Sequence, residues 1–478
     1  MSREGERSMG TGTMHDGAND SLTRPPLFRD GSFWGLTATQ FLGAFNDNVF
    51  KQQLLLLFVA VPTATGSMDL QGVATIAFSI PFVLFSGFAG YLSDRYSKRR
   101  VIVLSKVAEI VVMAAGVLGF IAFGFAGLPA WLILYLMIVL FAMGGQSAFF
   151  GPGKYGILPE LFRKRDLPPA NSLILMTTFM AVIFGSALAG LLMDVLDDRL
   201  WIGGLLTVAI AAVGTWTSLA IRKTPVAAPE LRFSADCVAI PSDVRQAMRD
   251  DRQLTRALIA TSLFWTGAAL VQLIVNTVGK NQLGLEDRHT SLMVTGISIG
   301  IAIGGALGAP LLGHGVNLRA SMMAGWAVVV TLVAISFPGS ELTHWLGFRG
   351  MFVALTVLGA FTSIFSIPLQ VLMQARPPEA LKGRVIATQN LLNWVGICGA
   401  GLIYQAADSV LAKYELPPSW NFLAVAAILS VMLLVFFPKF ERQSGPVITG
   451  SLDPLVAEKL RRSRNRRKPK ETGDPPTA

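Results

Sequence analysis

Long apolar runs alternate with short polar connections along almost the whole chain. Each run is roughly 20 residues long, which is the length of helix that crosses about 30 Å of hydrocarbon. The pattern therefore predicts an all-α chain with about twelve membrane-spanning helices. The approximate spans are 33–61, 71–91, 101–125, 131–150, 172–193, 201–221, 254–278, 291–312, 320–337, 348–373, 385–407 and 422–437.

The composition supports this prediction. Hydrophobic residues make up 52% of the chain and charged residues 15%, and the mean hydropathy is +0.53. Soluble domains carry more charge, so these values indicate a polytopic membrane protein. The stretch before Pro25 is polar and lacks the apolar core of a cleavable signal peptide. We therefore expect an N-terminal tail, with the first span directing insertion.

Lysine and arginine are divided unevenly between alternate connections. One side carries basic clusters, whereas the other carries isolated cations such as Arg199 and Lys280. The positive-inside rule places the basic side and both termini in the cytoplasm, as in a multi-pass protein of the inner membrane. The net charge of +10 is then explained by loops beside anionic membrane lipids, and nucleic-acid binding is not needed. The basic clusters are 95–100, 163–165, 222–256, 376–384 and the C-terminal tail.

A polar interval that contains several prolines divides the spans six and six, which is typical of a chain built from two related halves. A Pro-Glu pair followed by an asparagine at a fixed offset occurs in both halves, at 159 to 171 and at 378 to 390. These features favour parallel halves, the arrangement of a major facilitator transporter. Within the interval, 242–250 is predicted to form a short surface helix capped by Ser242. The expected divisions are a tail 1–32, a half 33–221, a linker 222–253, a half 254–437 and a basic tail 438–478.

The connection between the second and third spans reads Gly90-Tyr-Leu-Ser-Asp94-Arg95-Tyr-Ser-Lys98-Arg99-Arg100 and closely resembles the loop motif of major facilitator transporters. A glycine lets neighbouring helices approach, and an acid followed by bases can latch a cytoplasmic gate. The alternative is a basic cluster that only follows the positive-inside rule. The matching stretch of the second half, 308–319, has no acid, so we expect the gating charge to be one-sided. The candidate gating residues are Gly90, Asp94, Arg95, Arg99 and Lys154.

Asp47 and Lys51 stand in the middle of the first apolar run. A charged side chain at bilayer depth costs roughly 2.5–3.5 kcal/mol on insertion scales, so it normally faces a partner or a water-filled cavity. The two residues are four apart and share one helical face. We interpret them, with Asn46 and Asn48, as part of a substrate or ion pathway. The alternative is a structural ion pair that neutralises itself inside the bundle.

Polar residues recur at helical spacing in other spans, which favours a shared wet face through the bundle. In the third span Lys106 and Glu109 are three apart, and Glu109 either pairs with Lys106 or faces the cavity. Amides at such positions also serve as glue between helices. The further candidate binding residues are Glu109, Gln146, Gln272, Asn276, Gln370, Gln374 and Asn390.

Three segments are similar to the bacterial lysophospholipid transporter family. They read Gln40-Phe-Leu-Gly-Ala-Phe-Asn-Asp-Asn48, Phe149-Phe-Gly-Pro-Gly-Lys-Tyr-Gly-Ile-Leu-Pro-Glu-Leu161 and Thr261-Ser-Leu-Phe-Trp265. The resemblance covers about 33–437 and is closest to the transporter portion of transporter–acyltransferase fusions. It implies a flippase that moves lysophospholipids, chiefly lysophosphatidylethanolamine, to the inner leaflet for reacylation. It also implies a separate acyltransferase as a partner.

Two other functions remain open at the level of sequence. Asp47 can instead be a proton or sodium site that drives transport of a soluble metabolite or drug. The chain can also be a non-transporting partner that docks an acyltransferase, although such a scaffold has no need of charge at mid-membrane depth. The sequence shows no catalytic triad, metal cluster or phosphate-binding loop. We therefore expect a monomeric transporter, not an enzyme, without cofactors or metal ions.

Overall fold

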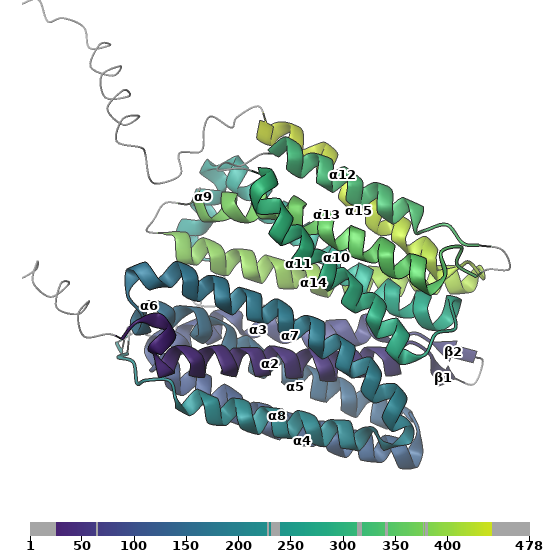
Figure 1. Ribbon diagram of the computed structural model, residues 1–478, viewed down its shortest axis with the longest axis horizontal. Helices are drawn as coiled ribbons and strands as arrows, with labels where there is room; N and C mark the ends of the chain where they lie inside the picture. Colours follow the sequence, from purple (N-terminus) through teal and green to yellow (C-terminus); the bar gives the residue numbers. More distant parts are fainter. Residues whose placement is uncertain are drawn as a thin grey trace, which may run out of the picture.

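The computed structural model shows an all-helical bundle whose described residues include twelve long helices, six in each half of the chain (Figure 1). The N-terminal half comprises α2 (Gly31–Leu57), α3 (Gln71–Arg95), α4 (Lys98–Ala126), α5 (Ala130–Gly156), α7 (Leu167–Leu196) and α8 (Leu200–Leu219). The C-terminal half comprises α10 (Arg252–Thr277), α11 (Asp287–Leu312), α12 (Leu318–Ala334), α13 (Gly347–Ala375), α14 (Lys382–Lys413) and α15 (Asn421–Glu441).

The structure describes residues 25–63, 66–226, 229–230, 240–312, 318–339, 343–375, 377 and 381–441. Most of the predicted N-terminal tail, the end of the basic tail, Cys237 and part of the stretch 308–319 lie outside these residues.

Short elements mark the two ends of the bundle. The strands β1 (Val61–Thr63) and β2 (Gly66–Met68) form an antiparallel hairpin at one end, which we call the hairpin end. The opposite end carries the α3–α4 connection, α6 (Leu158–Leu161) and α9 (Ser242–Asp250), and we call it the basic end (Figure 1).

Each predicted span overlaps one long helix, and most helices extend a few residues beyond it. A helix satisfies its backbone hydrogen bonds internally, which is why an apolar run in hydrocarbon adopts this structure. The first span was predicted too long at its C-terminal end, because α2 stops at Leu57 and the chain then enters the hairpin. At its N-terminus α2 is capped by Asp30, whose carboxylate accepts from the Ser32 amide.

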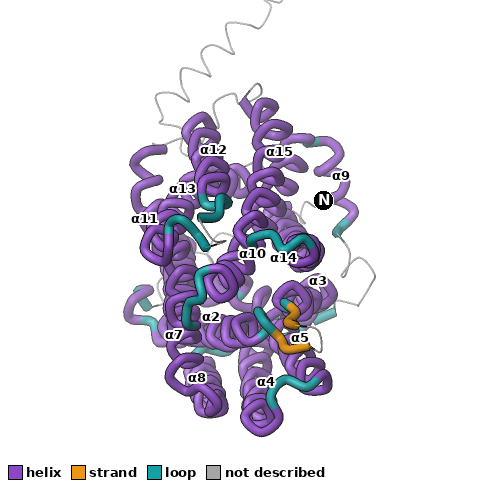
Figure 2. Tube along the Cα trace, turned by 90° about the vertical axis from the view of Figure 1, so that its right-hand side faces the viewer, coloured by secondary structure: helices purple, strands orange, loops and turns teal. Residues whose placement is uncertain are grey.

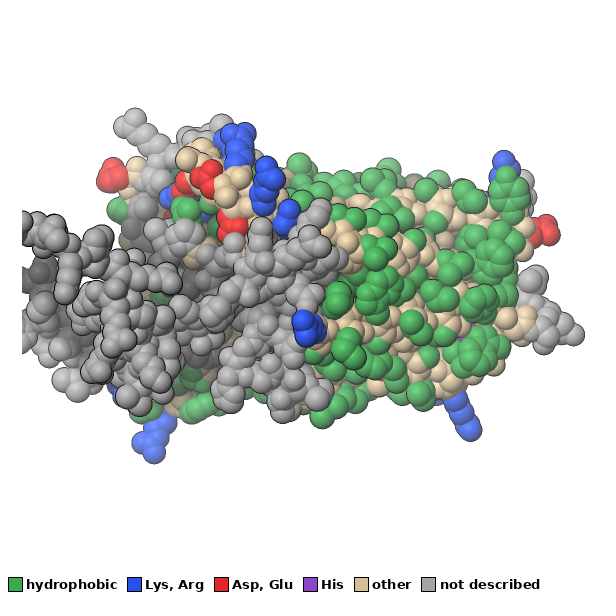
Figure 3. Space-filling model, turned by 90° about the horizontal axis from the view of Figure 1, so that it is seen from above, with side chains coloured by type: hydrophobic (Ala, Val, Ile, Leu, Met, Phe, Trp, Pro, Cys, Tyr) green, Lys and Arg blue, Asp and Glu red, His purple; other side chains and the backbone are tan. Residues whose placement is uncertain are grey.

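Nine helical stretches in the described part of the chain are long and apolar enough to cross a membrane, and one of them, Pro169–Leu219, contains both α7 and α8. The helix α2 is not among them, because its central polar residues lower its hydropathy. On the part of the face in Figure 3 that is coloured by side-chain type, hydrophobic side chains cover most of the bundle, and charged ones gather mainly toward one end with a few at the other. This distribution fits a bundle surrounded by hydrocarbon.

The two halves lie side by side and meet mainly through two pairs of helices, α3 with α14 and α7 with α11 (Figure 2). Near the hairpin end, a Cβ added to Gly72 of α3 would lie 2.6 Å from the carbonyl oxygen of Gly401 in α14. Gly190 of α7 meets Ser291 of α11 in the same way. Small residues permit this close approach of backbones, which is how membrane helices gain packing contacts.

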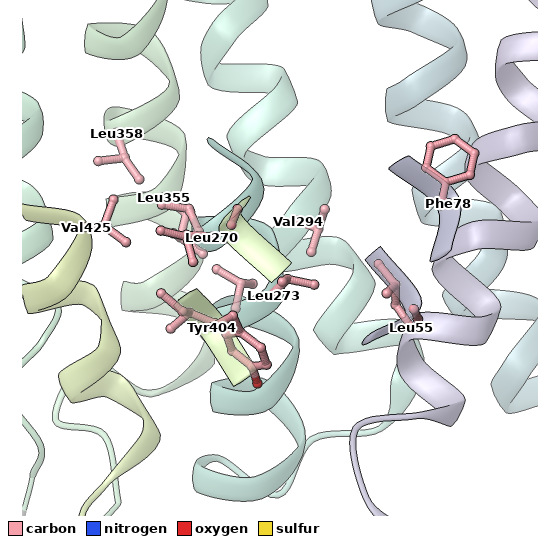
Figure 4. Packing of buried hydrophobic residues seen from close by; sticks show 14 of the residues in the cluster. Leu55, Phe78, Leu270, Leu273, Val294, Leu355, Leu358, Tyr404 and Val425 are labelled. Atoms are coloured by element: carbon pink, nitrogen blue, oxygen red, sulfur yellow. The ribbon is translucent and has the colours of Figure 1, made fainter. Parts of the chain in front are cut away.

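Aromatic and aliphatic side chains continue the contact between the halves. Midway along the bundle, Phe82 stacks on Trp394 with ring centroids 3.6 Å apart. In Figure 4, Tyr404 lies beside Leu273 within the buried cluster, while Phe78 and Leu55 belong to helices of the other half. The halves are therefore joined by packed side chains as well as by close backbones.

The short helix predicted in the linker is present as α9, with the expected bounds. Its predicted cap is wrong, since the residue at the N-cap position is Pro241 and no side chain caps the helix. An ion pair between Asp243 and Arg384 connects α9 to the start of α14.

Candidate functional site

The carboxylate of Asp47 is held by two side chains of α5. The Ser147 hydroxyl donates to one oxygen at 2.5 Å, and Gln146 Nε2 donates to the other at 3.3 Å. Asp47 is only partly buried, although it lies in the middle of a bundle helix. Sequence reasoning named Asp47 and Gln146 but missed Ser147, since a serine in an apolar helix usually bonds to its own backbone.

Lys51 lies one turn from Asp47 on the same face of α2. Its Nζ stands 5.6 Å from the ring centroid of Phe78 in α3, a cation–π contact. Within the described residues, Asp47 is not among the carboxylates that form an ion pair with a lysine or arginine. The self-neutralising pair considered from the sequence is therefore not what the structure contains.

Glu109 instead forms the buried ion pair of this region. Its carboxylate pairs with Lys106 on the same helix, and each side chain is 1% exposed. The amide of Asn46 donates to the other Glu109 oxygen at 2.9 Å, which ties α2 to α4. Of the two possibilities left open by the sequence, pairing with Lys106 is the one observed.

Two glycines make room for the Lys106 side chain. A Cβ added to Gly43 of α2 would lie 2.8 Å from Lys106 Nζ, and one added to Gly214 of α8 would lie 3.0 Å from its Cε. The Thr215 hydroxyl donates to the Lys106 backbone carbonyl at 3.0 Å. The ammonium is thus enclosed between α2, α4 and α8.

Charge in the middle of the N-terminal half is not balanced pair by pair. Asp47 interacts electrostatically with Lys51 and Lys154, as well as with Lys106 and Glu109. Because Lys106 and Glu109 neutralise each other, the Asp47 carboxylate remains with two ammonium groups, those of Lys51 and Lys154. Lys154, predicted as a gating residue, also lies over the Tyr155 ring at 4.8 Å from its centroid.

Several other predicted site residues differ from this cluster in their surroundings or lie partly outside the described set. Asn48 donates to the Ala44 carbonyl of its own helix at 2.7 Å. Gln370 and Asn390 are exposed, and Gln374 lies in α13 with a side chain outside the described set. Within the described residues, the hydrogen bonds to the Asp47 carboxylate come from Gln146 and Ser147 and not from Asn48, Gln370 or Asn390.

Gln272 and Asn276 lie farther toward the hairpin end, where they bond to the other half of the chain. Gln272 donates to Gln52 at 3.1 Å, and Gln52 donates to Asn276 at 2.9 Å. Asn276 in turn donates to Gln71 at 2.8 Å. Both predicted residues thus act as glue between the halves in this conformation.

Next to these amides, Asp69 is the centre of a network that sequence reasoning missed. One Asp69 oxygen accepts from Tyr404 at 2.7 Å and from Thr277 at 2.9 Å, both in the C-terminal half. Gln71 donates to both Asp69 oxygens, and Gln405 donates to the Asp69 backbone carbonyl. We call Asp69, Gln71, Thr277 and Tyr404 the hairpin-end latch.

Burial raises the pKa of the Asp69 carboxyl, even though the hydrogen bonds from Tyr404, Gln71 and Thr277 act in the opposite direction. Asp69 precedes the first turn of α3, in a connection between spans, so neither its depth nor its spacing marks it in the sequence.

The predicted gating residues lie at the basic end and make contacts within the N-terminal half. Arg99 donates to the carbonyls of Leu219 at 3.0 Å and Ile221 at 2.5 Å. Arg95 donates to the Tyr91 hydroxyl at 2.9 Å. The Arg99 bonds fasten the start of α4 to the C-terminal end of α8, whereas the Arg95 bond lies within α3.

One expectation about this connection is wrong. Gly90 allows no close approach here, because a Cβ added to it would meet nothing within 4 Å. The side chain of Asp94, the acid of the loop motif, is 57% exposed and lies 3.9 Å from Lys98. Lys98 forms its short contact with Glu160 of α6 instead, whose side chain is 18% exposed.

Comparison with known proteins agrees with the resemblance found in the sequence. The chain is 29% identical over 390 residues to the lysophospholipid transporter LplT of Enterobacter sp. (strain 638), covering 80% of this chain and 89% of the relative. It is 28% identical over 398 residues to LplT of Klebsiella pneumoniae subsp. pneumoniae, covering 81% and 91%.

Solved structures of transporters share the fold. A point mutant of the nucleoside transporter NupG matches with a TM-score of 0.64 at 14% identity, covering 85% of this chain and 99% of that one. An auto-inhibited peptide transporter of the POT family matches with a TM-score of 0.65 at 15% identity, covering 89% and 99%. The family model of the Major Facilitator Superfamily matches residues 36–401, which is well over half of the sequence. The chain therefore belongs to the Major Facilitator Superfamily of membrane transporters.

Proposed function

We propose that this protein transports lysophospholipids of the lysophosphatidylethanolamine type across the membrane. The proposal is supported by the relatives that carry the name lysophospholipid transporter, which align over four fifths of the chain. The observation that carries it is the charge around Asp47: a carboxylate and a lysine ammonium lie on one face of α2 without pairing to each other.

A zwitterionic headgroup has the complementary charges. Its phosphate can approach Lys51, with Lys154 as a second cation, while its ammonium approaches Asp47. Each of these groups then gains an oppositely charged partner at short range, which offsets the cost of holding charge at this depth.

The acyl chain requires apolar surroundings throughout the movement. Removing it from them costs about 0.8 kcal/mol for each methylene group, so a chain of ordinary length cannot cross an aqueous cavity. We infer that the headgroup moves past Asp47 while the chain stays in contact with apolar walls or with the bilayer.

We further propose that the basic end faces the cytoplasm and that the protein lies in the inner membrane with both termini inside. The clustering of lysine and arginine in the connections at that end supports this orientation. The direction of net movement is then toward the inner leaflet, where a separate acyltransferase can restore the second chain. The two halves bury their contacts against each other within one chain, which supports function as a monomer.

Reconstitution into liposomes tests the proposed function. Purified protein is expected to move labelled lysophosphatidylethanolamine between leaflets faster than protein-free liposomes do, and imposed pH or sodium gradients show whether movement is coupled. Folded protein that moves no lysophospholipid under any gradient would overturn the proposal. Uptake of soluble metabolites by the same liposomes tests the alternative function, transport of a soluble solute.

A further inference from the structure

A groove opens on the outer surface of the N-terminal half between α3, α4 and α5. Its volume is about 370 Å³, and side chains from all three helices line it. Leu104 is 61% exposed at this surface, where the bundle faces hydrocarbon. The apolar residues of its wall are Leu92, Val101, Leu104, Ala108 and Phe149.

The two ends of the groove are polar. Arg100, an exposed residue in the first turn of α4, lies at the basic end, and Gln146 of α5 lies at the inner end. Since a helix rises about 1.5 Å per residue, the wall between Arg100 and Ala108 extends about 12 Å into the membrane. Arg100 at the membrane surface is therefore followed, deeper in the groove, by a continuous apolar wall.

We propose that this groove binds a monoacyl phospholipid from the leaflet at the basic end, with its phosphate on Arg100 and its acyl chain along the apolar wall. The assignment of this lipid as the transported substrate rests on the proposed function. A guanidinium binds phosphate through paired hydrogen bonds, and a surface arginine lies at the depth of lipid phosphates.

The size of the groove favours one chain over two. A water molecule occupies about 30 Å³ in the liquid, and a methylene group is of similar size, so the groove holds roughly a dozen such groups. The groove volume therefore corresponds to one acyl chain. A diacyl phospholipid would leave its second chain outside, without contact to the protein.

The inner end of the groove touches the candidate site. Gln146 lines the groove, and its amide donates to Ser147 at 2.7 Å and to Asp47 at 3.3 Å. A lipid that fills the groove thus lies one side chain away from the Asp47 carboxylate. We therefore call the groove the station, meaning an intermediate binding site from which the headgroup passes to or from Asp47 and Lys51.

Photolabelling of the full-length protein in liposomes tests the station directly. The probe is a lysophosphatidylethanolamine with a photoreactive group in its acyl chain, and adducts are located by mass spectrometry. We expect adducts at Leu104, Ala108 and Phe149, more than at Val107 and Val111. The latter two are exposed on α4 but do not line the groove. Excess unlabelled lysophospholipid should remove the groove adducts, whereas excess diacyl phospholipid should not.

Two substitutions test the same groove through transport. Ala108→Trp fills the inner part of the groove, and Val107→Trp is its matched control on the same helix. Arg100→Gln removes the cation, with Arg165→Gln as a control at another exposed arginine of the basic end. We expect each groove variant to lower long-chain lysophospholipid transport by about tenfold relative to its control, because a phosphate or chain contact is lost.

The outcomes distinguish a failure of the groove proposal from a failure of the proposed transport function. Groove adducts that resist competition, or that diacyl lipid removes equally well, would identify ordinary surrounding lipid and overturn the station. Active wild-type protein without groove adducts would overturn it as well. Wild-type protein that moves no lysophospholipid would instead remove the proposed function, and with it the assignment of the occupant as substrate.

Discussion

At the scale of single residues, the structure distinguishes two kinds of buried charge that look alike in the sequence. Lys106 and Glu109 are almost fully buried and satisfy each other. Asp47 and Lys51 are partly exposed and lack a mutual ion pair. Buried pairs serve structure, whereas charges left without an opposite charge at membrane depth are candidates for binding.

The first prediction concerns Asp47. Replacing it with Asn preserves the size of the side chain and one hydrogen-bond acceptor but removes the charge. A hydrogen bond to a charged group contributes about 1.5–3 kcal/mol, so lysophosphatidylethanolamine transport should fall roughly tenfold to a hundredfold. Transport in liposomes is the measurement, with Asp198→Asn, an exposed acid at the hairpin end, as the control. Wild-type rates from folded Asp47→Asn protein would contradict the assignment.

The second prediction concerns the buried pair. Glu109→Gln leaves the Lys106 ammonium buried without its carboxylate, and breaking a buried pair in this way costs about 3–5 kcal/mol of stability. Replacing both residues with Met removes the two charges together and should cost much less. Thermal unfolding in detergent compares the three proteins. A double variant less stable than Glu109→Gln would show that the unpaired Lys106 ammonium is not the source of the destabilisation.

At the scale of elements, glycines set how closely particular helices approach. Gly144 of α5 lies directly against the backbone of α3, and a Cβ there would collide with the Phe78 carbonyl oxygen. This contact places α5, which carries Ser147, next to α2 and α3. The position of Ser147, which donates a hydrogen bond to Asp47, therefore depends on a residue that has no side chain of its own.

The third prediction follows from this contact. Gly144→Ala should push α3 and α5 apart and lower stability by about 1–3 kcal/mol, the usual cost of overpacking. Gly151→Ala on the same helix is the control, since nothing lies within 4 Å of an added Cβ there. Alanine is the better helix former by about 1 kcal/mol, so the control should be neutral or more stable. Equal melting temperatures of both variants would contradict the prediction.

At the scale of the whole molecule, the two halves are fastened at the hairpin end. The latch joins Asp69 and Gln71 to Thr277 and Tyr404 across the interface between the halves. In this conformation the hairpin end is closed. A transporter of two halves must release such contacts to expose its centre to the other side of the membrane.

The fourth prediction is a pH dependence of this closure. Because burial raises the pKa of Asp69, the closed state favours the neutral acid. The closed latch is therefore fully stable at low pH and loses stability as the pH rises through the raised pKa. The titratable groups that face Asp69 are Tyr404 and Asp408 of α14.

Distances between spin labels at Met68 and Tyr414, two exposed residues of opposite halves at this end, report the opening. They should lengthen in a growing fraction of molecules as the pH rises, and Asp69→Asn should flatten this response. Asp198→Asn should leave it unchanged. A response of the same size in Asp69→Asn would assign the titration to another group.

Much of this molecule can be predicted from local features of the chain. Apolar runs of membrane length determine where the twelve helices form, since their backbone hydrogen bonds are made within each run. The depth of Asp47 and its spacing from Lys51 likewise identify the candidate site, because charge in hydrocarbon is costly wherever the helix lies.

Other features depend on which helices become neighbours, and only the tertiary structure decides them. Spacing places Glu109 beside Lys106 but cannot show that Asn46 completes the pair, and it cannot separate Gln272 and Asn276 from the residues around Asp47. The latch around Asp69 joins residues up to 335 positions apart in the chain. Such contacts arise from helix packing over long distances in sequence, where local hydrophobic pattern carries no information.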